Sequence, residues 1–343
     1  MLVRLRPAGP WRIGPDSGDR DRVDRVYHSD SLYAAVTGAM ARLGVLEQWL
    51  DATARAAHSA VRFSSCFPFL GDTLYVAPPS HVWPPPPSSR VRWKGAKFVP
   101  LKVVETLLAG QALKEESWMV DAASECLLGS AAPSGTAVFR TAVRSNAAMD
   151  RAGQSALPHS TACIEFAPGA GLWFTVAFSD DRAHEQWSER VRGALRLLAD
   201  SGFGGGRSRG WGRAEMPEIV EAPLTTLLLK PAGTLLKASE AGVESGYWLL
   251  SLFHPSDNDA VDWQRGHYTI TSRGGRIESA AGWGAEKSPA RMVTEGSVLV
   301  AASEPRGCAP DVAPAGFEHP VYRAGFALAL PVPLKPVAAT VPS

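Results

Sequence analysis

The segment that most constrains the folding of this chain is glycine-rich and lies between a helix pattern and a strand pattern. Residues 201–215 read SGFGGGRSRGWGRAE, with six glycines and three arginines between Gly202 and Arg213. Glycine loses more backbone freedom on folding than any other residue, up to ~1 kcal/mol relative to alanine. A loop with a purely structural role rarely keeps so many glycines, so the segment indicates a function that needs bare backbone.

The segments on either side of this glycine loop predict an α+β unit. Residues 180–202 repeat apolar side chains at helical spacing, with Asp180 at the start and Gly202 after the end. Residues 28–44 form a second helix pattern, with Ser29 as its N-cap. With a long insertion set aside, the order is strand, helix, strand, strand, helix, strand. This is the ferredoxin-like arrangement shared by RNA-recognition domains.

These patterns predict an α+β protein whose first unit is ferredoxin-like (RRM-like). This unit covers residues 1–221 and carries a long insertion, about residues 80–168, with a projecting hairpin, and the glycine-rich loop at 202–213. Residues 222–335 form a second, β-rich region. Its strand patterns lie at residues 247–253, 267–272, 297–300 and 324–331, and residues 336–343 are expected to form a tail.

Composition narrows the classes of function. The 343 residues carry 35 Lys+Arg against 34 Asp+Glu, so RNA binding would have to come from a local patch. The four cysteines lie far apart without a CxxC pair, which is typical of free thiols in the cytoplasm. No apolar run approaches the ~18 residues that cross a membrane. The opening residues are too broken by Arg, Pro and Gly for a signal peptide, so we expect a cytoplasmic protein without membrane contact.

Three interpretations of the glycine loop compete. A phosphate loop for nucleotides needs a lysine or a G-x-G-x-x-G spacing before a helix, whereas this loop lacks both and follows a helix. A structural loop explains Gly202 at a helix end but not the other glycines. An RNA backbone clamp explains the bare amides and the arginines together. The predicted RNA contacts are Gly204, Gly205, Gly206, Arg207, Ser208, Arg209, Gly210 and Trp211.

Trp211 has two interpretations, because its ring could stack on a base or pack beneath the loop. Outside the loop, the helix start at His28 and Ser29 offers free amides to a phosphate, although Ser29 could serve only as an N-cap. Asp30 would repel phosphate and is expected to face away. Further candidate RNA contacts are Arg140, Arg144, Asn146 and Arg151 on the hairpin, otherwise a solvated surface, and Lys94 and Lys97, which together with Lys102 could equally face a partner protein.

The sequence contains no pattern that supports a catalytic site or a metal site. His28 lies just before the first helix, where a metal-independent ribonuclease could use it as a general acid or base, but Tyr27 is its only candidate partner. The acidic stretch HPSDNDAVD at residues 254–262 lacks the calcium-loop pattern, and no serine lies in a G-x-S-x-G elbow. We predict no catalytic residue, no metal and no cofactor.

Several motifs resemble one family. GFGGGRSRGWG after an amphipathic helix resembles the glycine-rich loop of the RAMP superfamily of CRISPR proteins. HSDSLYAAV, FPFLGDTLYVAPP, KGAKFVPLKVVETLLAG and VRSNAAMDRAGQSA resemble segments of the RAMP subunit that caps the crRNA 5′ end in type III-A (Csm) effector complexes. TEGSVL and HPVYRAGFALALPV resemble its closing strands. The matches run in one order from about residue 2 to residue 333, so they cover nearly the whole chain.

The resemblance implies two tandem ferredoxin-like (RRM-like) domains, the first with a projecting thumb hairpin and the second degenerate and β-rich. It also implies a non-catalytic subunit of an RNA-guided surveillance complex in antiviral defence. Such a subunit binds the crRNA 5′ tag and links the large polymerase/cyclase-like signature subunit to the backbone RAMP subunit. The tag would lie across the glycine loop, the start of the first helix and the basic hairpin. The alternatives are a RAMP-type endoribonuclease that processes CRISPR repeat RNA, and an adaptor that contacts proteins but no RNA.

Overall fold

The centre of the molecule is a seven-stranded antiparallel sheet. In this computed structural model, residues 1–15, 17–85, 93–133, 135–149, 156–229, 244–279 and 282–335 are described. The strand order is β11-β1-β10-β3-β4-β5, and β2 also pairs with β10. The strands are β1 (Leu2–Leu5), β2 (Val61–Phe63), β3 (Phe67–Leu70), β4 (Thr73–Val76), β5 (Val99–Pro100), β10 (Ala170–Phe178) and β11 (Glu218–Val220).

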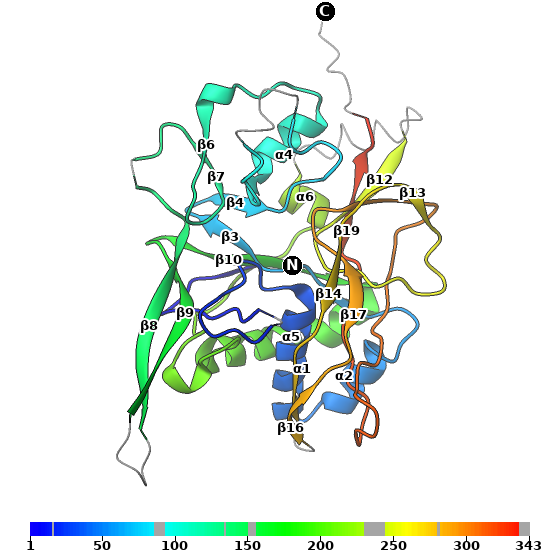
Figure 1. Ribbon diagram of the computed structural model, residues 1–343. Helices are drawn as coiled ribbons and strands as arrows, with labels where there is room; N and C mark the ends of the chain where they lie inside the picture. The colour runs from blue at the N-terminus through cyan, green and yellow to red at the C-terminus, as the bar shows by residue number, and fades with distance from the viewer. Residues whose placement is uncertain are drawn as a thin grey trace, which may run out of the picture.

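Two helices cover one face of this sheet. β2 and β3 pair with successive parts of β10, so together they act as one interrupted strand. Taken in chain order, the four central strands therefore lie in the spatial order fourth, first, third, second. The crossovers are α1 (Ser29–Arg42) and α5 (Asp181–Ser201), which pack side by side below the sheet in Figure 1, with α2 (Leu46–Ala52) beside them.

The opposite face of the sheet is covered by the insertion. Its elements are α4 (Leu101–Leu108), a 3-10 turn (Glu115–Ser117), β6 (Trp118–Val120) and β7 (Leu127–Gly129), and α6 (Leu224–Leu228) joins them above the sheet (Figure 1). Trp173 of β10 and Phe67 of β3 face this layer and are fully buried. RNA-recognition domains present aromatic side chains to RNA on this face. Here that surface is filled by protein, so RNA would have to bind elsewhere.

A second antiparallel sheet has the order β13-β18-β12-β19. Its strands are β12 (Ser245–Leu249), β13 (Val261–His267), β18 (Val298–Ala301) and β19 (Ala329–Pro333). The spatial order is again fourth, first, third, second. The connections at residues 250–260 and 302–328, which correspond to α1 and α5, contain no helix. Two further strand pairs are inserted between β13 and β18, formed by β14 (Ile270–Arg273) with β17 (Ala290–Val293) and β15 (Arg276–Ser279) with β16 (Gly282–Glu286).

These observations confirm the predicted mixture of helices and antiparallel strands. Both long helix patterns form helices within two residues of the expected ends. The predicted N-cap Ser29 is wrong: His28 is the N-cap of α1, and the Ser29 hydroxyl bonds to the Leu252 amide instead. The projecting hairpin within the insertion consists of β8 (Phe139–Met149) and β9 (Ala156–Phe166), which pair along their whole length. Figure 1 shows this hairpin extending from the body of the molecule.

A buried ion cluster joins the two sheets at the start of α1. The Asp30 carboxylate is 4% exposed and accepts hydrogen bonds from Arg273 of β14, Nε and Nη2 each at 3.2 Å, and from Arg323. Burial opposes ionisation of Asp30, but the guanidinium groups of Arg273 and Arg323 more than offset this and lower its pKa to about 2. The expectation that Asp30 faces away from an RNA surface agrees with this burial.

The two residues before Asp30 also contact the second unit. His28 Nδ1 lies 2.8 Å from Oε1 of Glu295, which also accepts a hydrogen bond from the Ser65 hydroxyl. The Ser29 hydroxyl accepts a hydrogen bond from the Leu252 amide at 3.0 Å. Three consecutive residues at the start of α1 thus hold the second sheet in place.

Substituting Asp30 by Asn should destabilise the fold by about 3–5 kcal/mol, because it removes the charge that neutralises two buried guanidinium groups. Urea unfolding of the purified chain measures this change. The matched control is Asp72→Asn, whose fully exposed carboxylate lies 3.8 Å from Arg4 and should contribute nothing measurable. Equal midpoints for the two variants would contradict the assigned role of Asp30.

The His28–Glu295 pair should make stability depend on pH. Burial lowers the pKa of His28, but the Glu295 carboxylate and its hydrogen bond prevail and raise it. A raised folded pKa gives stability that is complete below the unfolded value of about 6.5 and is lost as pH rises through the folded value. Relative to His28→Asn, the wild-type chain should therefore lose unfolding free energy as pH rises from about 6.5 through the raised pKa of His28. Urea midpoints that change in parallel over this range would rule the pair out.

Candidate nucleic-acid interface

The glycine loop forms one exposed turn on a tightly packed base. Residues 207–209 make a single 3-10 turn between Gly206 and Gly210, which both have left-handed backbone with φ of 77° and 76°. The side chains of Arg207, Ser208 and Arg209 are exposed at the top of this turn. Among the described residues, none accepts a hydrogen bond from the amides of Gly206, Arg207 or Ser208. The turn therefore presents cations and bare amides together.

Close packing inside the loop explains some of its glycines. A Cβ on Gly206 would lie 2.7 Å from the Trp211 ring, and one on Gly212 would lie 2.1 Å from the Phe203 carbonyl oxygen. Trp211 is only 9% exposed, and Arg209 lies over its ring with 5.7 Å from the guanidinium carbon to the centroid. Of the two interpretations of Trp211, the structure favours packing beneath the loop over an open stacking platform.

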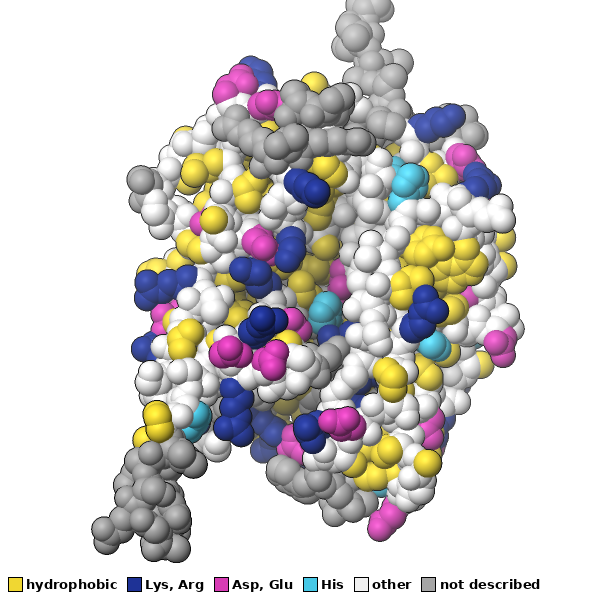
Figure 2. All heavy atoms as spheres, viewed as in Figure 1, with side chains coloured by type: hydrophobic (Ala, Val, Ile, Leu, Met, Phe, Trp, Pro, Cys, Tyr) yellow, Lys and Arg dark blue, Asp and Glu magenta, His cyan; other side chains and the backbone are white. Residues whose placement is uncertain are grey.

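The two exposed arginines of the turn contact different parts of the molecule. Arg207 Nη2 lies 2.7 Å from Oε2 of Glu278, on β15 of the second unit. Arg209 donates to the Thr161 hydroxyl at 3.3 Å and lies 3.2 Å from Nε2 of His159, both on β9. The turn thus lies between the hairpin and the second unit. Figure 2 shows Lys and Arg side chains gathered over this part of the surface, between the β8–β9 hairpin and β14–β17.

The basic residues of the hairpin form a separate group. Arg140 and Arg144 both pair with Glu165 of β9, with 3.0 Å between Arg140 Nη2 and Oε2. These three side chains line a groove of about 780 Å³ at the base of the hairpin. The exposed Asn146 amide donates to the Arg144 carbonyl, and Arg151 lies outside the described residues. No described hydrogen bond joins this group directly to the glycine loop, but Arg144 and Asn146 lie opposite Thr161 and His159, the β9 residues that Arg209 contacts.

The lysines of the insertion lie at a further edge. Lys97 pairs with Glu125, 3.0 Å from Nζ to Oε2, and Arg25 approaches the same oxygen at 3.3 Å. Lys94 is exposed. Both interpretations of these lysines, as RNA contacts or as contacts for a partner protein, stay open.

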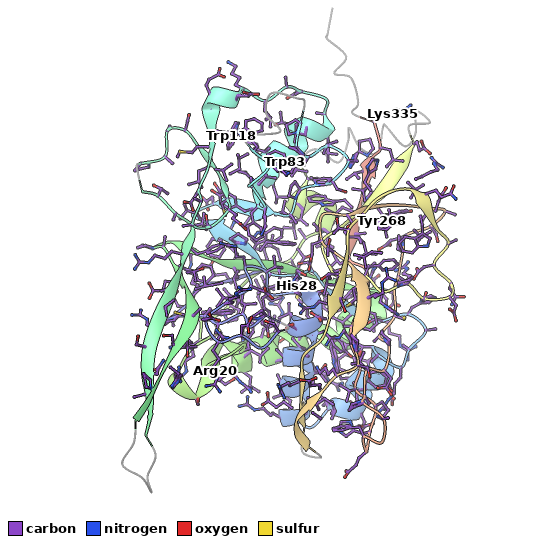
Figure 3. The ribbon with its side chains drawn as sticks, viewed as in Figure 1. Arg20, His28, Trp83, Trp118, Tyr268 and Lys335 are labelled. Carbon is purple, nitrogen blue, oxygen red and sulfur yellow. The ribbon has the colours of Figure 1, made fainter. Side chains whose placement is uncertain are left out.

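His28 and Ser29 are placed in the junction between the two sheets rather than on the exposed turn. Their side chains bond to Glu295 and the Leu252 amide, and Figure 3 shows His28 near the centre of the molecule. Their predicted RNA contact stays a prediction. No local sequence pattern points to these partners, because both lie more than two hundred residues away along the chain.

The described residues contain no group of three or more His, Cys, Asp or Glu side chains arranged to hold a metal ion. The four cysteines are free thiols. No helix in the described parts of the chain is both long and apolar enough to cross a bilayer.

Substituting Gly206 by Ala should destabilise the fold by about 1–3 kcal/mol more than substituting Gly210, because only the first new methyl group meets a buried ring. Gly210→Ala is a matched control, since it has the same left-handed φ and nothing within 4 Å of the new Cβ. Urea unfolding compares the two variants. Equal losses would show that the contact with Trp211 does not restrict Gly206.

Comparison with known proteins adds independent evidence. Residues 243–332 match the family described as the CRISPR Csm4 C-terminal domain. No curated protein sequence matches the chain.

The fold of the chain is similar to one in the crystal structure of the Csm3–Csm4 subcomplex in the type III-A CRISPR-Cas interference complex. The TM-score is 0.64 at 16% identity, and the match covers 98% of this chain and 99% of that one. Crystal structures of the Csm1–Csm4 cassette with pppApA and with cA4 give TM-scores of 0.54 at 18% and 19% identity, covering 97% of this chain and 98% of the other. The resemblance indicated by the sequence agrees with these comparisons: residues 243–332 match the model of the Csm4 C-terminal domain family, and the fold of the chain is similar to folds in crystal structures of the type III-A Csm3–Csm4 subcomplex and of the Csm1–Csm4 cassette.

Proposed function

We propose that this chain binds the 5′ tag of a crRNA as a non-catalytic subunit of a cytoplasmic type III-A Csm complex. The observation that carries the proposal is the exposed turn with Arg207 and Arg209, held between the hairpin and the second unit. Guanidinium groups bind phosphate through paired hydrogen bonds, and amides without acceptors add further donors. A turn of this kind suits a single strand whose bases are splayed apart.

The proposal also includes a linking role. The Csm4 structures that this chain resembles were determined with Csm3 in one case and with Csm1 in others. We infer that this chain likewise joins a large signature subunit to the first backbone subunit. The near-zero net charge is consistent with one basic RNA-binding area on a surface otherwise used for protein contacts.

Two tandem ferredoxin-like units are part of the same proposal. Both four-stranded sets follow the fourth, first, third, second order that this arrangement requires. In the second set, coil replaces both crossover helices. Such a unit would owe its stability to the first one, through the contacts at the start of α1.

A ribonuclease function is less favoured by the site. A general acid or base must reach the reacting group with a free ring nitrogen. His28 Nδ1 is bound to Glu295, which leaves only Nε2, and a side chain that is 17% exposed in the junction between the units gives an RNA little access to that nitrogen. We therefore propose that the chain is not an enzyme. Cleavage of repeat RNA is one of the outcomes measured in the RNA-binding experiment.

The test is RNA binding by the purified chain, alone and assembled with its Csm1-type and Csm3-type partners. A fluorescent single-stranded RNA that begins with the repeat-derived tag is titrated at several salt concentrations. The variant with both Arg207→Ala and Arg209→Ala should bind roughly ten- to a hundredfold more weakly, because it loses charge-assisted hydrogen bonds. Each lost phosphate contact should also reduce the slope of log K against log salt by about 0.7.

Glu278→Gln is the matched control for this experiment. It removes the carboxylate that pairs with Arg207 and leaves Arg207 itself in place, so RNA affinity should rise. An RNA affinity absent at every salt concentration, in the chain and in the assembly, would favour the adaptor alternative. Cleavage of repeat RNA that is lost on His28→Ala would favour the endoribonuclease.

A further inference from the structure

Residues 10–12 link the glycine loop to the hairpin. The Arg12 carbonyl accepts a hydrogen bond from the Gly205 amide at 2.8 Å, and the Pro10 carbonyl accepts one from Gly212 at 3.0 Å. On the other side, Trp11 exchanges backbone hydrogen bonds with Ile164 of β9 at 2.9 and 2.6 Å. This short segment therefore fixes the distance between the turn that carries Arg209 and the strand that Arg209 contacts.

The Arg12 side chain also holds a third segment, residues 17–25, against β9. Its guanidinium donates to four main-chain carbonyls, those of Asp19 at 2.6 Å, Arg20 at 2.9 Å, Arg22 at 3.1 Å and Ala162 of β9 at 2.8 Å. The Ala162 amide in turn donates to the Arg20 carbonyl at 2.8 Å. One side chain thus folds residues 17–25, the N-terminal loop, against β9.

This arrangement places two exposed arginines, Arg20 and Arg209, beside the same strand, β9. The main chain of Arg20 lies on Ala162, and the side chain of Arg209 lies on Thr161 and His159, the adjoining part of β9. Figure 3 shows Arg20 beside the β8–β9 hairpin. Burial, followed by the nearby charge of Arg20, lowers the pKa of Arg12, and Arg209 adds to this effect. Like charges held together repel one another unless an anion lies between them.

The N-terminal loop also contains acidic groups, which oppose the binding of a phosphate. The Asp19 carboxylate accepts a hydrogen bond from the Ser17 hydroxyl, and Asp21 is the acid that acts on Arg12. A phosphate beside Arg20 would be attracted by the arginines and repelled by Asp21. Single substitutions of Arg20 or Asp21 can therefore make the charge beside the phosphate less positive or more positive.

We propose that the RNA-binding surface extends from the glycine loop onto the N-terminal loop, where Arg20 contacts a phosphate, and that Arg12 is the positioning residue for this extension. The proposal rests on the RNA-binding function proposed above. Arg12 acts through the loop and not by contacting RNA, because both of its Nη atoms already donate to carbonyl groups of the protein. The ligand is a single-stranded RNA backbone, which continues from Arg207 and Arg209 toward Arg20.

The proposed positioning role requires an arginine at position 12. A guanidinium group has five donors in a planar fork and stays charged, so it can bind several carbonyls at once. A lysine at position 12 keeps the charge but has one nitrogen with three donors. Arg12→Lys therefore separates positioning from charge.

The experiment combines amide hydrogen exchange with RNA titration of the full-length chain. In RNA-free protein, Arg12→Lys should increase exchange at residues 17–25 and leave α5 protected. Arg20→Ala should reduce RNA affinity and lower the salt slope by about 0.7, as expected for one phosphate contact. Asp21→Asn should increase the affinity. In an Arg12→Lys background, Arg20→Ala should have little further effect, because the loop is already released.

The outcomes separate this inference from the proposed function. If Arg12→Lys matches the wild type in both exchange and affinity, Arg12 is not a positioning residue. If Arg20→Ala binds normally while the Arg207 and Arg209 variant does not, the extension is wrong and the proposed function stands. If the wild type binds no RNA, the proposed function and the RNA contact fail together. Arg55→Ala, which changes an arginine paired with Glu47 beside α2, is the control that should leave binding unchanged.

Discussion

The arrangement of the two units depends on a buried ion cluster at the first turn of α1. Asp30 accepts hydrogen bonds from Arg273 and Arg323, and the adjacent His28 and Ser29 add contacts to the same unit. Burying a carboxylate is unfavourable unless its charge is matched, so the cluster strongly favours one way of joining the sheets. Arg273 ends β14, and Glu278 follows five residues later on β15, next to Arg207. The interaction that joins the units therefore also determines what lies beside the candidate RNA site.

The covered face of the central sheet has a second consequence. An RNA-recognition domain uses the sheet face opposite its helices, but here the insertion buries the corresponding aromatic residues, among them Trp173. The cationic surface is instead formed by loops at the side of the sheet, near the base of the hairpin. Loops position side chains well only when their own backbone is held. Arg12 and the packed glycine loop provide that support through contacts with main-chain carbonyls and with Trp211.

The glycine loop packs closely against the protein on one side and leaves its backbone open on the other. Below the turn, Gly206 and Gly212 let the backbone approach Trp211 and Phe203 closely. At the top, Gly210 has open space where a Cβ would lie, and the arginines beside it are exposed. Composition alone suggested one function for all the glycines. Their three-dimensional surroundings divide them into those that pack and those that leave the surface open.

The sequence by itself determined the local elements and the family resemblance. Helical spacing predicted α1 and α5, strand-like ends around a polar, basic middle predicted the projecting hairpin, and the order of motifs resembled that of a RAMP-type subunit. Only the tertiary structure decided that Trp211 packs beneath the loop, that His28 and Ser29 lie in the junction, and that Arg12 holds the N-terminal loop against β9. The physical reason is the separation of the partners along the chain. Helices and hairpins follow from neighbours in the chain, whereas the partners of Arg12, Ser29 and His28 lie 150, 223 and 267 positions away, and no local pattern encodes such contacts.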